Sequence, residues 1–109
     1  MSNISSALNF LPCPFEVSGW IEHYDSAIES IPSGSWLALQ EVPKPYSFLW
    51  GQRYVIKYNG LTLTRRIGRS DTDAIVKGHA EDTNHETIDI PVSKIQELYL
   101  VVGSMSRFH

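Results

Sequence analysis

Apolar and polar residues alternate most regularly between residues 53 and 68 (RYVIKYNGLTLTRRIG). Residues 54–58 are rich in tyrosine, valine and isoleucine, which favour β-strands, and residues 61–67 form a second such run. Between them stand Asn59 and Gly60, the pair preferred in a two-residue type I′ turn because both turn positions need a positive φ. The pattern therefore predicts a β-hairpin, which is the strongest local signal in the chain.

The two-residue turn also fixes which residues face one another. It places three cross-strand pairs on one, apolar side of the hairpin: Tyr54 with Arg65, Ile56 with Leu63, and Tyr58 with Leu61. Arg65 is therefore predicted on the apolar side. Arg53 and Arg66 become neighbours on the other, more polar side, where like charges repel. We expect a carboxylate partner near these two arginines.

The segments before the hairpin are short and separated by turn residues. Residues 20–30 (WIEHYDSAIES) carry apolar residues near helical spacing and are expected to form one or two helical turns. Gly19, just before them, is expected to end a strand. In chain order we predict a strand at 15–19, these helical turns, a turn at 31–35, a buried strand at 36–39, a loop at 41–45 and an aromatic segment at 46–51.

The segments after the hairpin follow the same pattern. Ser93 is expected to cap a single turn at residues 94–97. In chain order we predict a polar turn at 69–73, a strand at 74–78, a polar loop at 80–86, an edge strand at 87–91 stopped by its proline, the capped turn, and a largely buried strand at 98–103. Six or seven short strands with hardly any helix predict a mainly β fold, a small antiparallel domain.

Length and composition limit the chain to one domain. Its 109 residues, 42% hydrophobic and 19% charged, suit a single domain at 15–109 that follows an arm or linker at 1–14. The alternative for residues 1–14 is a segment that docks on a partner. Apolar residues in this segment are too few and too interrupted for a signal peptide, and no later stretch has transmembrane length. We therefore expect a cytoplasmic protein with no membrane association.

The net charge and the cysteine content limit the classes of partner and the compartment that the chain suits. The formal net charge of −3 argues against a general nucleic-acid surface, which needs clustered positive charge. The only dense basic run is Arg65, Arg66 and Arg69. Cys13 is the single cysteine, so the chain has neither an internal disulfide nor a multi-thiolate metal site, and a reducing compartment is the default.

Three other groups of residues could form a metal site, a catalytic site or a binding surface. Each of them also has a purely structural interpretation. One loop holds His79, Glu81, Asp82 and His85, which suit a divalent ion but match no metal motif; a solvated polar loop is favoured, and we expect no cofactor. Ser26 with Asp25 and His23 has the residue types of a catalytic triad, but three residues within a four-residue stretch favour a capped turn. The aromatic residues Trp20, Trp36, Tyr46, Phe48 and Trp50 are expected to be core or cover, the alternative being an exposed partner surface.

Taken in order, these features resemble a known family. The run Val17-Ser18-Gly19, the Ser-Ile-Pro-x-Gly-Ser turn at 30–35, the hairpin with its Arg-Arg-Ile ending, and the closing segments at 90–92 and 98–103 (LYLVVG) are similar to the C-terminal domain of LexA-type and phage repressors. The resemblance covers roughly residues 15–103. It rests on the order of the features and not on a single motif. It implies a mostly β fold, dimerisation, and self-cleavage by a serine nucleophile with a lysine base.

The position of the nucleophile depends on the register of the alignment. In the family the serine belongs to a Gly-Asp-Ser-Met sequence after a strand-ending glycine, and counting from Gly19 puts Ile21 at that place. A second register aligns Asp25-Ser26-Ala27 with the family's Asp-Ser-Met. In this register Ser26, eight residues before Gly34, takes the place of the family's serine. That register requires an insertion after Gly19. The residues leave both registers open.

The family's lysine position is occupied by Arg65 in either register. An arginine stays protonated at any accessible pH, so it cannot take a proton from a serine. Lys57 is close in sequence but is predicted on the opposite face of the hairpin, and no Ala-Gly or Cys-Gly cleavage dipeptide precedes Phe15. The resemblance therefore implies a degenerate serine/lysine peptidase domain.

We expect a non-catalytic relative of the repressor peptidase domain, in the context of transcriptional regulation. It would form a homodimer through residues 98–108, as the resemblance and an exposed-edge argument imply, or bind another protein. Direct DNA binding is not expected, because the family's helix-turn-helix is not in this chain. The alternative is an active self-cleaving peptidase with Ser26 as nucleophile and Lys77 or Lys44 as base. A third possibility is a likeness of architecture alone, which would say nothing of function.

Overall fold

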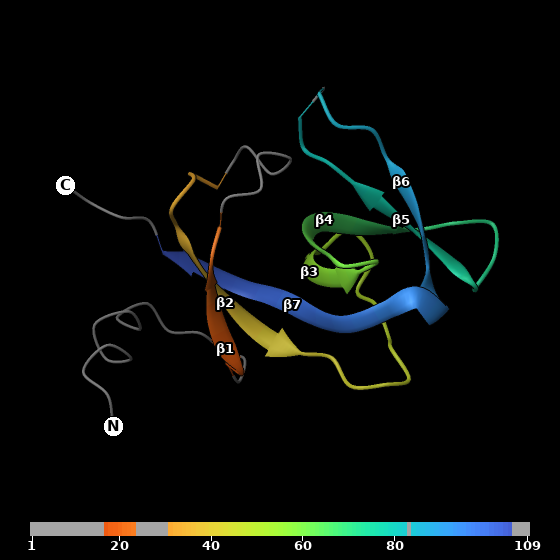
Figure 1. Cartoon of the computed structure of the whole chain (residues 1–109), viewed down its shortest axis with the longest axis horizontal. Coiled ribbons are helices and arrows are strands. Elements are labelled where there is room, and N and C mark those ends of the chain that lie inside the picture. The colour runs from red at the N-terminus through yellow and green to blue at the C-terminus, as the bar shows by residue number, and fades with distance from the viewer. Residues whose placement is uncertain (1–16, 24–30, 83, 106–109) are drawn as a thin grey trace.

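The described residues form one antiparallel sheet of seven strands. The structure is a computed structural model that describes residues 17–23, 31–82 and 84–105. The strands are β1 (Gly19–Glu22), β2 (Trp36–Glu41), β3 (Arg53–Tyr58), β4 (Leu61–Arg69), β5 (Ile75–His79), β6 (Ile88–Pro91) and β7 (Ile95–Met105), with a 3₁₀ turn η1 (Val92–Lys94) before β7. Their order in the sheet is β1-β2-β7-β3-β4-β5-β6 (Figure 1). The predicted mainly β, antiparallel fold is confirmed.

The hairpin forms as the residue pattern predicts. Tyr58 pairs with Leu61 and Tyr54 pairs with Arg65, which is the expected register. The turn residues Asn59 and Gly60 have φ values of 53° and 76°, so both adopt the left-handed conformation that the type I′ turn requires. Because asparagine and glycine tolerate this conformation best, the local sequence alone determines the pairing of β3 with β4.

β7 is an interior strand of the sheet, between β2 and β3. Its residues from Tyr99 to Met105 pair with β2, and those from Ile95 to Leu100 pair with β3. Figure 1 shows β7 crossing the molecule, with β1 and β2 against one half and the β3–β4 hairpin against the other. Tyr99 and Leu100 pair with both neighbouring strands, so the exposed-edge argument for a dimer through residues 98–108 does not hold for these two. Beyond Leu100, the described part of β7 pairs with β2 alone, and there the argument stays a prediction. Residues 106–108 lie outside the described residues.

Two apolar clusters lie along the sheet. The larger is built from Tyr54, Ile56, Ile67, Val76, Ile90, Ile95, Leu98 and Leu100, all 7% exposed or less. The smaller is built from Ile31, Leu37, Leu39 and Val55. Because Ile56 and Val55 are neighbours in β3, their side chains point to opposite faces and each joins a different cluster. The hairpin therefore has an apolar core residue on both faces, and its second side is less polar than expected.

The first strand lies later in the chain than predicted. Gly19 begins β1 and does not end it, and Trp20 and Ile21 are strand residues opposite Ala38 and Leu37, so the prediction of helical turns is wrong for them. The cause is pairing with a segment that is distant in the chain. Hydrogen bonds from His23 N to Ser35 O (2.7 Å) and from Gly34 N to His23 O (2.8 Å) continue the pairing of β1 with β2. The remainder of the predicted helical segment, residues 24–30, and residues 15–16 lie outside the described residues.

The predicted capped turn at 94–97 is also wrong. Ser93 lies within η1 and makes no side-chain cap, and residues 95–97 already belong to β7. A bulge causes the difference: Lys57 pairs with Glu97, but its neighbour Tyr58 pairs with Ile95, which leaves one extra residue in β7. The bulge lets Ile95 and Leu98 both reach the core although they are three residues apart, a spacing that mimics a helical turn.

The other strand predictions are confirmed within one or two residues. β2 and β5 lie at the predicted positions, and β6 is an edge strand that pairs with β5 alone and ends at Pro91. Within the described part of the chain, no helix is long and apolar enough to cross a membrane.

Candidate functional site

A hollow of about 550 Å³ lies between β1 and β4 and holds the residues that the family resemblance singles out. Ile21, which one register puts at the serine position, and Arg65, at the lysine position, both line it. The lining is completed by Glu22, His23, Leu37, Val55, Thr62, Leu63, Thr64 and His85. We call this the β1–β4 hollow. Ser26, the nucleophile of the other register, lies outside the described residues.

Arg65 is the buried cation of the hollow. It is 6% exposed, and its Nη1 donates a hydrogen bond of 2.8 Å to the carbonyl oxygen of Thr64. Strand geometry holds it there, because it pairs with Tyr54 and its Cβ lies beside the backbone of Gly78. The prediction that Arg65 lies on the buried side of the hairpin is confirmed. A guanidinium donates hydrogen bonds and accepts none, so at this position it can bind an oxygen but cannot remove a proton.

An aspartate and a histidine form a pair at the rim of the hollow. His85 Nδ1 lies 2.9 Å from both carboxylate oxygens of Asp82, and the backbone N–H of His85 donates to Asp82 Oδ1 at 3.2 Å. The Asp82 side chain is 3% exposed. Such a carboxylate orients the imidazole and leaves Nε2 for other contacts. The sequence shows both residues, but it does not show that the loop turns His85 toward β1.

The possible metal ligands of this loop do not meet at one point. His79 contacts Thr87 Oγ1 at 3.1 Å, Asp82 contacts His85, and Glu81 faces the hairpin. Among residues 17–23, 31–82 and 84–105, no three histidine, cysteine or acidic side chains are grouped as a metal site requires. The side chains of Asp82 and Glu81 are 3% and 14% exposed, so these two carboxylates are paired and largely buried and are not the solvated side chains expected of this loop.

Glu81 is the carboxylate partner that was predicted near Arg53 and Arg66. Its Oε2 lies 2.8 Å from Arg53 Nε and 2.7 Å from Arg66 Nε, so one carboxylate bridges both arginines. Its side chain is 14% exposed, and Arg66 Nη1 also donates to Gly51 O at 2.8 Å. The expectation of a carboxylate partner is confirmed. The bridge ties the β5–β6 loop to the hairpin.

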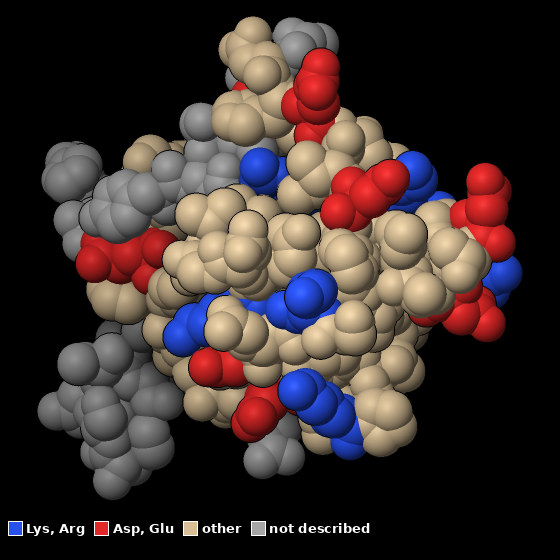
Figure 2. All heavy atoms as spheres, turned by 45° about the vertical axis from the view of Figure 1, so that its right-hand side comes forward, with Lys and Arg blue, Asp and Glu red and all other residues tan. Residues whose placement is uncertain are grey.

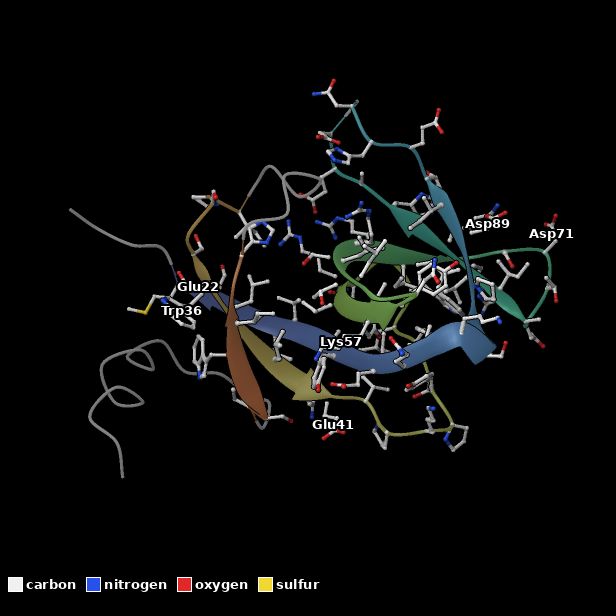
Figure 3. All side chains as sticks on the ribbon, in the orientation of Figure 1. Glu22, Trp36, Glu41, Lys57, Asp71 and Asp89 are labelled. Carbon is white, nitrogen blue, oxygen red and sulfur yellow. The ribbon has the colours of Figure 1, made fainter. Side chains whose placement is uncertain are left out.

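The lysines named as alternative bases lie elsewhere. Lys77 is paired with Asp89 on β6, and Figure 3 shows Asp89 on the opposite side of the molecule from Glu22 of the hollow. The Lys44 ammonium lies 5.8 Å from the centre of the Tyr46 ring. Of the described residues, no lysine lines the β1–β4 hollow. Arg65 is therefore the cation that occupies it.

A second, smaller groove of about 360 Å³ is lined in part by the aromatic side chains of Tyr46, Phe48 and Trp50. Phe48 stacks on Trp50 with ring centres 5.5 Å apart, and the Arg69 guanidinium lies 5.4 Å from the Trp50 ring centre. Trp50 is 42% exposed and its neighbour Leu49 is 56% exposed. For Trp50 this exposure favours the alternative of a partner surface over core or cover.

The surface charges are mixed in sign. Figure 2 shows lysine and arginine side chains interspersed with aspartate and glutamate on one face, with uncharged atoms between them. Lys57 and Glu97 form one exposed pair, at 3.6 Å, and Lys77 and Asp89 form another. This face lacks the continuous positive patch that phosphate backbones require.

Tyr99 and Glu97 form a hydrogen-bonded pair on the exposed side of β7. The hydroxyl of Tyr99 donates to Glu97 Oε1, and this bond, followed by burial, raises the pKa of Tyr99 from 10.0 to about 12. The same bond is the main cause that lowers the pKa of Glu97. The pair therefore favours a neutral tyrosine beside an ionised carboxylate.

Replacing Glu97 by Gln is expected to bring the pKa of Tyr99 back toward 10, because the negative charge that holds the tyrosine proton is removed. The folded Tyr99 keeps its proton to a higher pH than the unfolded one, so its contribution to stability is complete below pH 10 and is lost as the pH rises from 10 through about 12. An NMR titration of the tyrosine rings measures the shift. Asp71→Asn, on the distant β4–β5 turn, should leave the Tyr99 titration unchanged, and equal titrations in all three proteins would contradict the assignment.

No protein-family model matches the chain, and no curated protein is similar to it. The likeness to the repressor domains therefore rests on the residues quoted from the sequence.

Proposed function

We propose that this chain is a non-catalytic relative of the repressor self-cleaving peptidase domain, which acts by self-association or by binding another protein. The observation that carries the proposal is Arg65. It is buried in the β1–β4 hollow at the position of the family's lysine, and it cannot serve as a base. Its proposed context is a cytoplasmic transcriptional regulator.

The arrangement around Arg65 supports the proposal. Ile21, at the serine position of one register, lines the same hollow, so in that register both catalytic positions carry residues that cannot perform the reaction. The second register places the nucleophile at Ser26, but the described lysines Lys44 and Lys77 make their contacts away from the hollow. A serine there would have an arginine beside it in place of a base.

Exposed aromatic and aliphatic side chains support a role in binding. Trp50 and Leu49 present apolar surface beside the groove, and the Trp50 ring contacts both Phe48 and Arg69. Aromatic side chains fixed in this way lose little conformational freedom when a partner covers them. A homodimer would use the outer strands β1 and β6, or the end of β7 beyond Leu100, which pairs with β2 alone among the described strands.

The proposed function predicts that the intact mass shows no cleavage fragments after long incubation at about pH 10, where a Ser/Lys peptidase gains its neutral base. Ser26→Ala serves as the control and Arg65→Lys as the matched variant that supplies the family's base. Fragments from the original chain that vanish in Ser26→Ala would establish the peptidase and overturn the proposal. Fragments from Arg65→Lys alone would support it, because they would show that the arginine is what prevents cleavage.

Sedimentation of the same sample at tens of micromolar separates the two modes of binding. A dimer supports self-association, and a monomer would contradict it and direct the search to another protein.

A further inference from the structure

We infer that Asn59 is a site of spontaneous deamidation, which converts it to aspartate or isoaspartate at the tip of the β3–β4 hairpin. Asn59 and Gly60 are both exposed and have positive φ values. Nothing lies within 4 Å of the place where a side chain on Gly60 would begin. The rest of the fold therefore leaves open space beside the Cα of Gly60, and the attack further requires that the backbone nitrogen of Gly60 be available.

The hydrogen-bond pattern leaves this nitrogen available. Tyr58 and Leu61 are the last cross-strand pair, so they close the ladder and the two turn residues stand outside it. Among the described residues, no backbone hydrogen bond outside the strands involves the N–H of Gly60. This N–H can lose its proton to hydroxide without breaking a hydrogen bond of the fold.

The reaction needs only water. The deprotonated nitrogen of Gly60 attacks Cγ of Asn59, a carbon–nitrogen bond forms, and the side-chain nitrogen leaves as ammonia after taking up a proton. Water then adds to either carbonyl of the resulting cyclic imide and opens it to aspartate or to isoaspartate. No atom changes its oxidation state. Glycine in the next position favours the attack because it has no Cβ to obstruct ring closure.

Asn84 is a comparison site within the same chain. It is also exposed, but the residue after it is His85, which carries a side chain where Gly60 has none. That nitrogen already donates a hydrogen bond of 3.2 Å to Asp82 Oδ1. Attack from Asn84 would have to break this bond and move the imidazole that Asp82 holds. The structure therefore distinguishes two exposed asparagines by the environment of the following nitrogen.

The product changes the hairpin as well as the charge. Isoaspartate adds a methylene to the backbone, so the connection between Tyr58 and Leu61 is no longer a two-residue turn of the kind that sets the register. Either product adds one negative charge to a chain whose formal net charge is −3. The change lies next to Tyr58, which pairs with Ile95 beside the bulge of β7.

The test is a peptide map of the full chain at intervals during incubation at 37 °C and pH 7.4. We expect Asn59 to lose ammonia about tenfold faster than Asn84, because glycine presents no obstruction to ring closure. Part of the product should resist an aspartate-specific protease, which identifies isoaspartate. Asn59→Gly is the control, since Gly-Gly suits the same turn but has no side-chain amide.

Equal rates at Asn59 and Asn84, or an Asn59 that stays intact while Asn84 reacts, would overturn the inference. A mass increase in Asn59→Gly equal to that of the original chain would also overturn it, because the reaction would then lie elsewhere. Deamidation replaces an amide NH₂ by OH and leaves the chain whole. It is therefore distinct from the fragments that self-cleavage would release.

Discussion

Replacing Ile56 by Ala is expected to lower the free energy of unfolding by about 2–5 kcal/mol. Ile56 is fully buried in the larger cluster, in a strand that has neighbours on both sides. The shorter side chain loses its apolar burial and leaves a cavity that two flanking strands prevent from closing. Urea unfolding followed by circular dichroism measures the loss.

Leu61→Ala is the matched control for Ile56→Ala, because it removes an aliphatic side chain from the same hairpin. Leu61 is 54% exposed, so its replacement should change the stability by no more than about 0.5 kcal/mol. Losses of similar size in the two variants would show that the larger cluster is not the core of the fold.

Replacing Glu81 by Gln is expected to lower the free energy of unfolding by about 1–2 kcal/mol. The substitution keeps the shape of the side chain but removes the charge that bridges Arg53 and Arg66, which then repel each other across the strands. The loss stays below that of a fully buried pair because the Arg66 side chain is 41% exposed, and water screens it. Urea unfolding at low and high salt measures both the loss and its electrostatic origin.

Asp89→Asn is the control for the Glu81 bridge, because it removes one carboxylate from a pair with a single cation, Lys77. The side chains of this pair are 59% and 38% exposed, so the expected change is about 0.5 kcal/mol or less. If Glu81→Gln cost no more than Asp89→Asn, the bridge would be an ordinary surface contact.

The parts of the fold that follow from neighbouring residues were predictable from the sequence. The hairpin register follows from Asn59-Gly60, and from that register follow the burial of Arg65 and the need for a carboxylate beside Arg53 and Arg66. Each step uses only the geometry of a two-residue turn. The identity of that carboxylate, Glu81, was not predictable, because it depends on how the β5–β6 loop folds back over the hairpin.

The errors have a common physical cause, which is pairing between segments that are distant in the chain. Trp20 and Ile21 belong to a segment whose apolar residues are near helical spacing, but pairing with β2 makes these two strand residues. The spacing of Ile95 and Leu98 also suits a helix, and a bulge opposite β3 lets a strand bury both. Local periodicity carries no information about either partner strand.

The candidate site was predictable only in part, for the same reason. The position of Arg65 follows from the hairpin, but β1 reaches the hollow through its pairing with β2, and His85 through a loop. The pairing of Asp82 with His85 could have been suspected from their spacing of three residues. The position of His85 in the same hollow as Arg65 could not have been predicted, because no local sequence pattern relates the two segments.

The place of β7 between β2 and β3 has a consequence for how the chain assembles during synthesis. β2 and β3 are not neighbours in the sheet; each pairs with β7, which follows the other six described strands in the chain. Until the ribosome has released that strand, β1–β2 and β3–β6 are separate pieces with unpaired edges. The sheet can therefore be completed only after β7 has left the ribosome, by contacts between residues far apart in the chain, which is the slowest kind of folding step and the one most exposed to aggregation.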